Sequence, residues 1–325
     1  MFAFEGRWSA VLPLLSAWLL AGCATAGTPP SPAAEPLEIR GAIGVVELGP
    51  ARVAAEELYG KGAFIEHGGV FSLIDRENPV DLATNAETQL LVHSVNRPDL
   101  RIIMTLAEGH YRIVARRSAG INSVADLKGK RIGTMISSSS GYFLHLLLQR
   151  AGLSFDDIEL HDIRPYTAIT TALIAGDVDA ISIWEPHTEN AIRALGDDAF
   201  VIPSEGIYRE IFNLNTTAAT LADPSRRARI VEFIRALDKA IAQVNRDPRR
   251  AQELVAAAGD YSIEEIARSW KHHSFLSAFP DDLLDVMVDE ERWLAGVEGR
   301  EPRPREELAK LLDRSVFDEA LLQDR

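Results

Sequence analysis

Apolar and polar residues alternate along the chain in short blocks that predict strands and helices in regular succession. Strand-like patterns occur over 37–46, 68–74, 81–84, 100–106, 111–115 and 158–163. Helical spacing occurs over 51–59, 87–95 and 168–175. Because strands and helices follow one another in turn, the pattern predicts an α/β fold with a mainly parallel sheet.

The stretch 126–148 has the clearest pattern, which is turn, strand, polar loop and then helix. Its loop carries four serines over 137–140, followed by Gly141 and an apolar run from Tyr142. Such a junction places hydroxyls and free backbone N–H groups at the positive end of a helix dipole. The loop therefore indicates a binding position for a polar group. The plain structural alternative is that these serines only cap the helix and face solvent.

After Pro224 the pattern becomes helical, with Asp223 as the expected N-cap. Further helices are expected over 283–294 and 306–312, so the C-terminal segment is predicted to be all-helical. His272 and His273 are expected on one of these helices, packed or solvated, because no third residue is spaced to complete a metal site.

The N-terminal residues have the pattern of an export signal. A charged segment precedes the apolar run 8–20, which is shorter than the roughly 20 residues that a membrane-spanning helix needs. The run ends in Leu-Ala-Gly before Cys23, which resembles the lipobox of bacterial lipoproteins. We therefore predict a signal peptide over 1–22, lipidation of Cys23 and a flexible, Pro-rich tether over 23–36. Cys23 is the only cysteine in the sequence, so an internal disulfide or a CxxC site is excluded.

Length and charge narrow the class of protein. The chain has 325 residues, enough after the predicted signal to divide into two lobes. A formal net charge of −14 argues against nucleic acid as a partner. No second apolar run in the sequence approaches spanning length, so the expected membrane contact is the lipid on Cys23.

Three motifs together are similar to those of one family. They are Asp-Leu-Lys-Gly-Lys within 120–133, Gly-Asp-Val-Asp-Ala within 172–180, and Trp-Glu-Pro at 184–186. Over 37–246 the chain resembles the substrate-binding proteins of nitrate, sulfonate and taurine ABC importers, a branch that also includes binders of thiamine pyrimidine precursors. The resemblance implies a bilobal type 2 periplasmic binding fold with two mainly parallel sheets flanked by helices.

On this resemblance the chain crosses twice between its lobes. The first lobe is expected over 37–111 and 207–325, including the helical C-terminal segment, and the second over 112–206. The hinges are expected near 108–111 and 206–211. Ligand then binds between the lobes, which close on it.

Ligands of open α/β sheets bind beyond the carboxyl ends of the strands, and this rule selects the candidate site. The residues expected at the cleft are Glu47, Leu48, Asn85, Glu108, Ser138, Ser139, Ser140, Trp184 and Glu185. The serines favour an anionic head group. The three glutamates, with no obvious Arg or Lys beside them, favour a zwitterion or an amine instead.

Several of these residues also have a plain structural alternative. Trp184 follows an apolar strand, so packing in the core is as reasonable as a stacking wall. Glu47 and Glu185 are equally compatible with solvated surface acids, the commonest place for glutamate. No metal ligand set and no cofactor motif is found in the sequence.

The resemblance implies a monomeric, lipid-anchored receptor in the periplasm or at the cell surface. It captures a sulfonate- or taurine-like, or an amine- or pyrimidine-like, small molecule and delivers it to an ABC permease and its ATPase. One alternative is a ligand-binding lipoprotein that serves a sensor or a surface complex. A pyrimidine-synthase-like enzyme is disfavoured, because the sequence lacks the cysteine-rich motif of those enzymes.

Overall fold

The computed structural model describes residues 36–75 and 77–321, which belong to one compact unit. The predicted signal peptide over 1–22, Cys23 and the tether up to residue 35 lie outside the described residues. Across the described part, no helix combines the length and apolar character that a membrane span requires.

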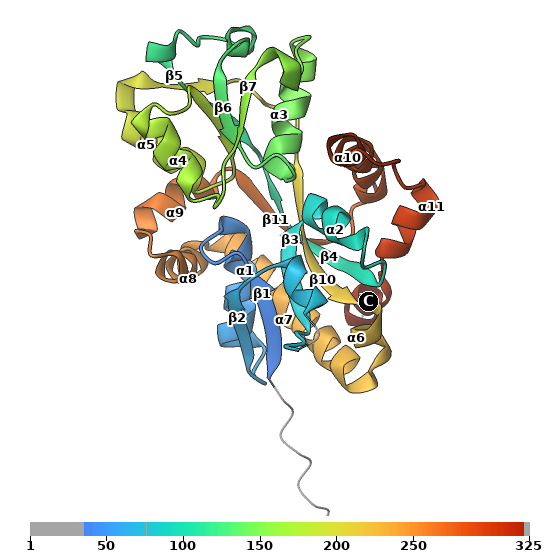
Figure 1. Cartoon of the computed structure of the whole chain (residues 1–325). Coiled ribbons are helices and arrows are strands. Elements are labelled where there is room, and N and C mark those ends of the chain that lie inside the picture. Colours follow the sequence, from blue (N-terminus) through green and yellow to red (C-terminus); the bar gives the residue numbers. More distant parts are fainter. Residues whose placement is uncertain (1–35, 76, 322–325) are drawn as a thin grey trace, which may run out of the picture. The chain divides into compact units, whose positions relative to one another are not determined.

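The first sheet has the strand order β11-β4-β10-β3-β1-β2 (Figure 1). Its strands are β1 (Leu37–Gly41), β2 (Ala63–His67), β3 (Leu82–Ala86), β4 (Leu100–Gly109), β10 (Glu210–Thr217) and β11 (His273–Ala278). Strand β1 pairs in parallel with β2 and β3, whereas β10 runs antiparallel to β3 and β4, and β11 runs antiparallel to β4. The sheet is therefore mixed.

Helices cover both faces of the first sheet. They are α1 (Gly49–Val53), α2 (Glu87–Ser94), α6 (Ala218–Ala222), α7 (Pro224–Arg246), α8 (Arg249–Gly259), α9 (Ile263–Trp270), α10 (Leu283–Glu298), α11 (Arg305–Leu308) and α12 (Ser315–Leu321). Successive residues of a strand point to opposite faces. Accordingly Ile103 packs in one apolar cluster with Ile234 of α7, and Ile102 packs in another with Leu90 of α2 and Leu294 of α10.

The second sheet has the order β7-β6-β8-β5-β9. Its strands are β5 (Arg112–Arg116), β6 (Arg131–Thr134), β7 (Glu159–Asp162), β8 (Ala180–Ile183) and β9 (Ala199–Ile202), and its helices are α3 (Ser139–Arg150), α4 (Ala168–Ala175) and α5 (His187–Leu195). Strand β6 is parallel to β7 and β8, and β5 is antiparallel to β8 and β9.

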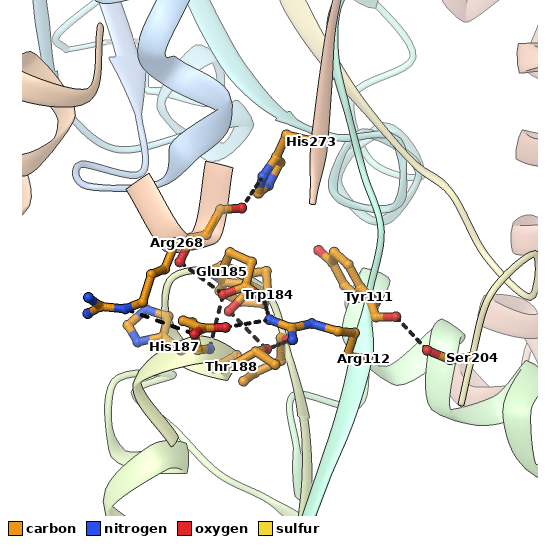
Figure 2. Close-up of polar contacts among 12 residues, drawn as sticks. Tyr111, Arg112, Trp184, Glu185, His187, Thr188, Ser204, Arg268 and His273 are labelled. Atoms are coloured by element: carbon orange, nitrogen blue, oxygen red, sulfur yellow. Dashed lines mark hydrogen bonds and ion pairs between the residues drawn. The ribbon is translucent and has the colours of Figure 1, made fainter. Parts of the chain in front are cut away.

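The chain passes from the first sheet to the second between β4 and β5, through residues 110–111, and returns between β9 and β10, through residues 203–209. We call these the outward and the return crossover. They are bonded to each other, because the Ser204 hydroxyl donates to the Tyr111 carbonyl at 2.9 Å (Figure 2). We propose that the first lobe comprises residues 37–111 and 207–325 and the second lobe residues 112–206. On this proposal the hinge lies at the two crossovers.

The α/β class with two helix-flanked sheets is confirmed, but several details of the prediction are wrong. Both sheets are mixed rather than mainly parallel. The C-terminal segment is not all-helical, since β11 pairs with the free edge of β4, a pairing that local helical periodicity cannot reveal. His273 therefore begins a strand, and His272 lies in the turn before it.

The predicted strand over 68–74 is also wrong, because β2 ends at His67 and Val70–Ile74 is a 3-10 helix. The side chain of Asn85 from β3 stabilises this turn by accepting a hydrogen bond from the Val70 N–H at 2.7 Å. A Cβ at Gly69 would lie 2.2 Å from the same Asn85 oxygen, so only glycine leaves room for the contact.

The Asp223 cap is confirmed, as its carboxylate accepts hydrogen bonds from the N–H groups of Ser225 and Arg226 at 2.8 and 3.0 Å.

Gly141 in the first turn of α3 provides a test of how tightly the serine loop is packed. A Cβ there would lie 2.0 Å from the Ile136 carbonyl oxygen, so Gly141→Ala should destabilise the fold by about 1–3 kcal/mol in urea unfolding. Gly296→Ala in α10 is the matched control, because no atom outside its own helix lies within 4 Å of the added Cβ. We expect the control to be neutral or slightly stabilising. Equal stability of the two variants would contradict the packing described here.

Candidate functional site

A cavity of about 180 Å³ lies between the two sheets at the carboxyl ends of their parallel strands. From the first sheet it is lined by residues at or just after the ends of β1, β2 and β3 and by two residues of β10. From the second sheet it is lined by residues that follow β6, β7 and β8. The volume suits a small solute, since pockets for drug-sized ligands begin at about 300 Å³. This position is where open α/β sheets bind ligands.

A wider groove of about 810 Å³ lies between α3 and α10. Its aromatic rings pack against each other, with the Tyr142 and Trp293 centroids 5.2 Å apart, and its Asp289 is paired with Arg292 at 2.7 Å. The groove is a surface between helices away from the strand ends, so the smaller cavity is the candidate site.

The serine loop contributes Ser138 and Ser139 to the cavity, as the sequence predicts, but not Ser140. Ser140 is fully buried behind them, where its hydroxyl is bonded to those of Thr134 and Ser138 at 3.1 and 2.9 Å. The Ser139 hydroxyl is bonded to the Tyr111 hydroxyl at 2.8 Å. These hydroxyls already have partners. The groups of the loop that are most available to a ligand are therefore the backbone N–H groups in the first turn of α3, which have no acceptor within the helix.

Glu47 lines the cavity from the first sheet, on a 3-10 turn after β1, whereas the neighbouring Leu48 is fully buried in the apolar core. The Oε1 atom of Glu47 is 3.2 Å from Nε2 of His273, and both side chains are almost fully buried. Burial acts to raise the pKa of Glu47 and to lower that of His273. Their mutual attraction and hydrogen bond outweigh it, so the pKa of Glu47 is lowered and the pKa of His273 is raised. The two therefore form a buried ion pair.

Glu210, at the start of β10, also lines the cavity and was missed from the sequence because its position fell within an expected hinge. The Tyr111 hydroxyl donates to its Oε1 atom at 2.8 Å. Burial, and then the negative charges of Glu47 and Glu87, raise the pKa of Glu210 well above its usual range. Oε2 of Glu47 and Oε2 of Glu210 are both buried without a hydrogen-bond partner. The raised pKa favours the neutral, protonated form of Glu210 beside the charged Glu47.

The other two predicted carboxylates, Glu185 and Glu108, do not line the cavity. Glu185 is buried in an ion pair with Arg112, whose guanidinium points at it in Figure 2, and accepts a hydrogen bond from the Ser269 hydroxyl at 3.1 Å. Glu108 pairs with Arg209 at 3.4 Å. The sequence interpretation that no Arg or Lys accompanies these glutamates is therefore wrong, and the uncompensated negative field it implied is not present.

Aromatic rings form the walls of the cavity. Trp184 lines it as predicted, joined by Phe71, Tyr166 and Phe212, which were missed. The Tyr166 and Trp184 ring centroids are 5.3 Å apart, and the Trp184 Nε1 atom is buried without an acceptor. Tyr166 follows β7, so the rule that selected the other loops applies to it once that strand is included.

Polar side chains reach across between the sheets beside these rings. Asn85 lines the cavity as predicted, with its oxygen bonded to the Val70 N–H. From α2, the Gln89 amide donates to the Ser137 carbonyl at 3.0 Å, which ties the first sheet to the serine loop. The cavity therefore combines aromatic walls, amide and carboxyl groups, and a helix N-terminus.

Comparison with known proteins identifies the kind of chain that carries this site. A family described as NMT1/THI5 like matches residues 72–251. Over 80 residues the chain is 38% identical to an Escherichia coli (strain K12) protein provisionally named as an aliphatic sulfonates-binding protein, and the match covers 25% of each chain. The chain thus spans about a quarter of the length of this curated relative.

Solved structures share the fold at low sequence identity. The alkanesulfonate-binding protein SsuA from Xanthomonas axonopodis pv. citri, bound to MOPS, has a TM-score of 0.71 at 19% identity, over 86% of this chain and 98% of that one. The desulfurization enzyme DSZB has a TM-score of 0.59 at 15% identity, over 89% of this chain and 100% of that one. The architecture is therefore the periplasmic binding protein fold, which binding proteins and an enzyme have in common.

The Glu47–His273 ion pair predicts a pH-dependent contribution to stability. Because the pKa of His273 is raised, its charge stabilises the fold fully below its unfolded pKa of about 6.5, and this contribution is lost as pH rises through the folded pKa. His273→Gln should therefore cost about 3 kcal/mol at pH 6 and clearly less at pH 9, measured by urea unfolding. His161→Gln, a partly exposed histidine beside Glu159, is the control and should cost little at either pH. A loss for His273→Gln that is the same at both pH values would refute a charged pair.

Proposed function

We propose that this chain, which belongs to the NMT1/THI5-like family, is a solute-binding protein that holds one small polar molecule in the cavity between its two sheets. The observation that carries the proposal is the lining of that cavity by strand ends of both sheets, with two crossovers linking the halves. A ligand there bridges the halves, so binding and closure are coupled.

The proposed ligand contacts come from both sides of the cavity. They are Glu47, Asn85 and Glu210 from the first sheet, and Ser138, Ser139, Tyr166 and Trp184 from the second. We assign a supporting role to the remaining predicted residues, Leu48, Glu108, Ser140 and Glu185, which hold the loops in place from outside the cavity.

The charges around the cavity support a neutral, zwitterionic or amine-bearing solute with a flat ring. No Arg or Lys is among its lining residues as far as the described chain shows, Glu47 is balanced by His273, and Glu210 is protonated. A simple anion finds no full positive charge there, whereas aromatic walls suit a ring or an ammonium group. A sulfonate- or taurine-like ligand is the second candidate, favoured by the helix N-terminus at Ser139 and by the names of the sulfonate-binding relatives.

We further infer that the protein delivers its ligand to an ABC permease and its ATPase as a monomeric, non-enzymatic lipoprotein of the periplasm or cell surface, anchored by Cys23. The motif resemblance and the binding-protein relatives support this role. A binding lipoprotein that serves a sensor has the same cavity, and the fold alone is compatible with an enzyme such as DSZB. Co-purification with a permease complex separates these roles, because a sensor partner would appear in its place.

A ligand screen tests the proposal directly. The chain from residue 37 onward should be stabilised against heat by at least one of aminopyrimidines, taurine, alkanesulfonates and nitrate, because a ligand at 100 times its Kd adds about 2.7 kcal/mol to the unfolding free energy. Calorimetry then gives the stoichiometry, which should be one. A failure of every compound to bind would sink the proposal.

Glu47→Gln separates the two ligand classes. With an amine-bearing ligand this variant should weaken binding by more than about 1 kcal/mol, because a charged hydrogen bond is lost. A purely anionic ligand should bind equally well or better. Glu66→Gln, an exposed acid on β2 that pairs with Arg40 outside the cavity, is the control and should leave the affinity unchanged. Calorimetry with the best compound of the screen provides the measurement.

A further inference from the structure

A second carboxyl pair is buried outside the cavity, between α2 and α10. Glu87 is the first residue of α2 and Glu290 lies on α10, and both are fully buried. The Tyr208 hydroxyl lies 2.9 Å from Oε1 of Glu87 and 3.3 Å from Oε1 of Glu290. A hydroxyl has one proton to donate, so Tyr208 can donate to only one of these two carboxyl groups. The other carboxyl group can bond to the Tyr208 oxygen only when it carries a proton itself.

This pair sits where the return crossover rejoins the first sheet. Tyr208 belongs to the crossover, and the N–H of Ile211, the second residue of β10, donates to Oε2 of Glu87 at 3.0 Å. The Tyr208 ring meets the ring of Tyr111 from the outward crossover edge-on, at 5.5 Å between centroids. Tyr111 is itself bonded to the buried acid Glu210. Each crossover thus supplies one tyrosine to a buried carboxyl group.

The described groups around the pair do not include a cation that could stabilise two negative charges on Glu87 and Glu290. The other titratable groups that face it are Tyr142 from α3, Tyr208 from the return crossover and Glu210 from β10, none of which is a cation. Among residues 36–75 and 77–321, no Arg, Lys or His forms an ion pair with Glu87 or Glu290.

The nearest arginines are engaged elsewhere. Arg303 donates to the adjacent Glu291 and to the Leu91 carbonyl of α2, and Arg300 also pairs with Glu291. Asp289, the other neighbour on α10, is exposed and paired with Arg292. Oε2 of Glu290 is buried and accepts no bond from an N–H or hydroxyl donor, so Glu290 is the natural holder of the proton.

We propose that the Glu87–Glu290 pair is a proton-operated latch on the hinge. While the pair holds one proton, Tyr208 and Ile211 fix the return crossover to the first sheet. When that proton leaves, two adjacent buried carboxylates repel each other, Tyr208 is released and the two sheets move more freely. The latch requires no ligand, so it stands independently of the proposed function.

The direction of the pH effect follows from burial. Burial is the main cause that raises the pKa of Glu87 to about 7 and that of Glu290 well above its ordinary value. The folded chain therefore holds more protons than the unfolded chain once pH exceeds about 4.5. Stability then falls as pH rises toward the folded pKa values, about tenfold in the unfolding constant per pH unit for each extra proton held.

Glu290→Gln tests the latch, because its amide donates a hydrogen bond without a titrating proton. In the full chain, the unfolding constant of the wild type should rise about tenfold or more per unit between pH 5.5 and 8.5, and the variant should show a markedly flatter profile in urea unfolding. Glu306→Gln, an exposed acid on α11, is the control and should follow the wild type. A variant slope equal to the wild-type slope would overturn the proposal.

Small-angle X-ray scattering distinguishes a latch from a purely structural buried pair. The radius of gyration of the ligand-free wild type should increase between pH 6 and 9, and that of Glu290→Gln should not. Tyr208→Phe, which removes the bonded hydroxyl but keeps the ring, should give the expanded value already at pH 6, and it provides the test if Glu290→Gln does not fold. An unchanged wild-type radius up to pH 9 would overturn the latch even if the stability profile changes as expected.

Discussion

The burial of carboxyl groups at the junction of the two sheets is the constraint on which the rest of the structure depends. A carboxylate loses its hydration there and must be compensated or neutralised. Glu47 and Glu185 are compensated by His273 and Arg112, whereas Glu210 keeps its proton. The groups that compensate these carboxylates come from β11, β5 and the crossovers, which must therefore meet at one place. The need to compensate buried charge thus helps to fix the positions of segments that are distant in the sequence.

Because its carboxyl groups are compensated or protonated, the cavity is nearly neutral, whereas the sequence suggested a negatively charged cleft. Glutamates near a binding site suggest a cationic ligand when they are unpaired, but here the negative charge of Glu47 is matched by an imidazolium. For the solute proposed here, selection would then rest on shape, ring stacking and hydrogen bonds. Such sites discriminate through polar groups that an incorrect ligand leaves unpaired, and Trp184 Nε1 is one such group.

The sequence predicted those parts of the site that depend on local pattern. Ser138, Ser139, Asn85 and Trp184 follow strands with clear signals, and the strand-end rule then places them together. It could not predict the pairing of Glu47 with His273, which are 226 residues apart, because no local pattern records which distant cation a buried acid will meet. Strand β11 was missed for the same reason, since the free edge of β4 recruits a segment without strong strand character.

The order in which the strands join the first sheet has a consequence for how the chain acquires its structure during synthesis. Strands β5 to β9 form the second sheet from one continuous stretch of sequence, so it can assemble as soon as that stretch is available. The first sheet must wait for β10, and the histidine beneath the cavity arrives only with β11. Until then Glu47 has no counter-ion, so the proposed binding cavity is among the last features of the protein to mature. A chain stopped before residue 273 has more than four fifths of its folded part but no finished site.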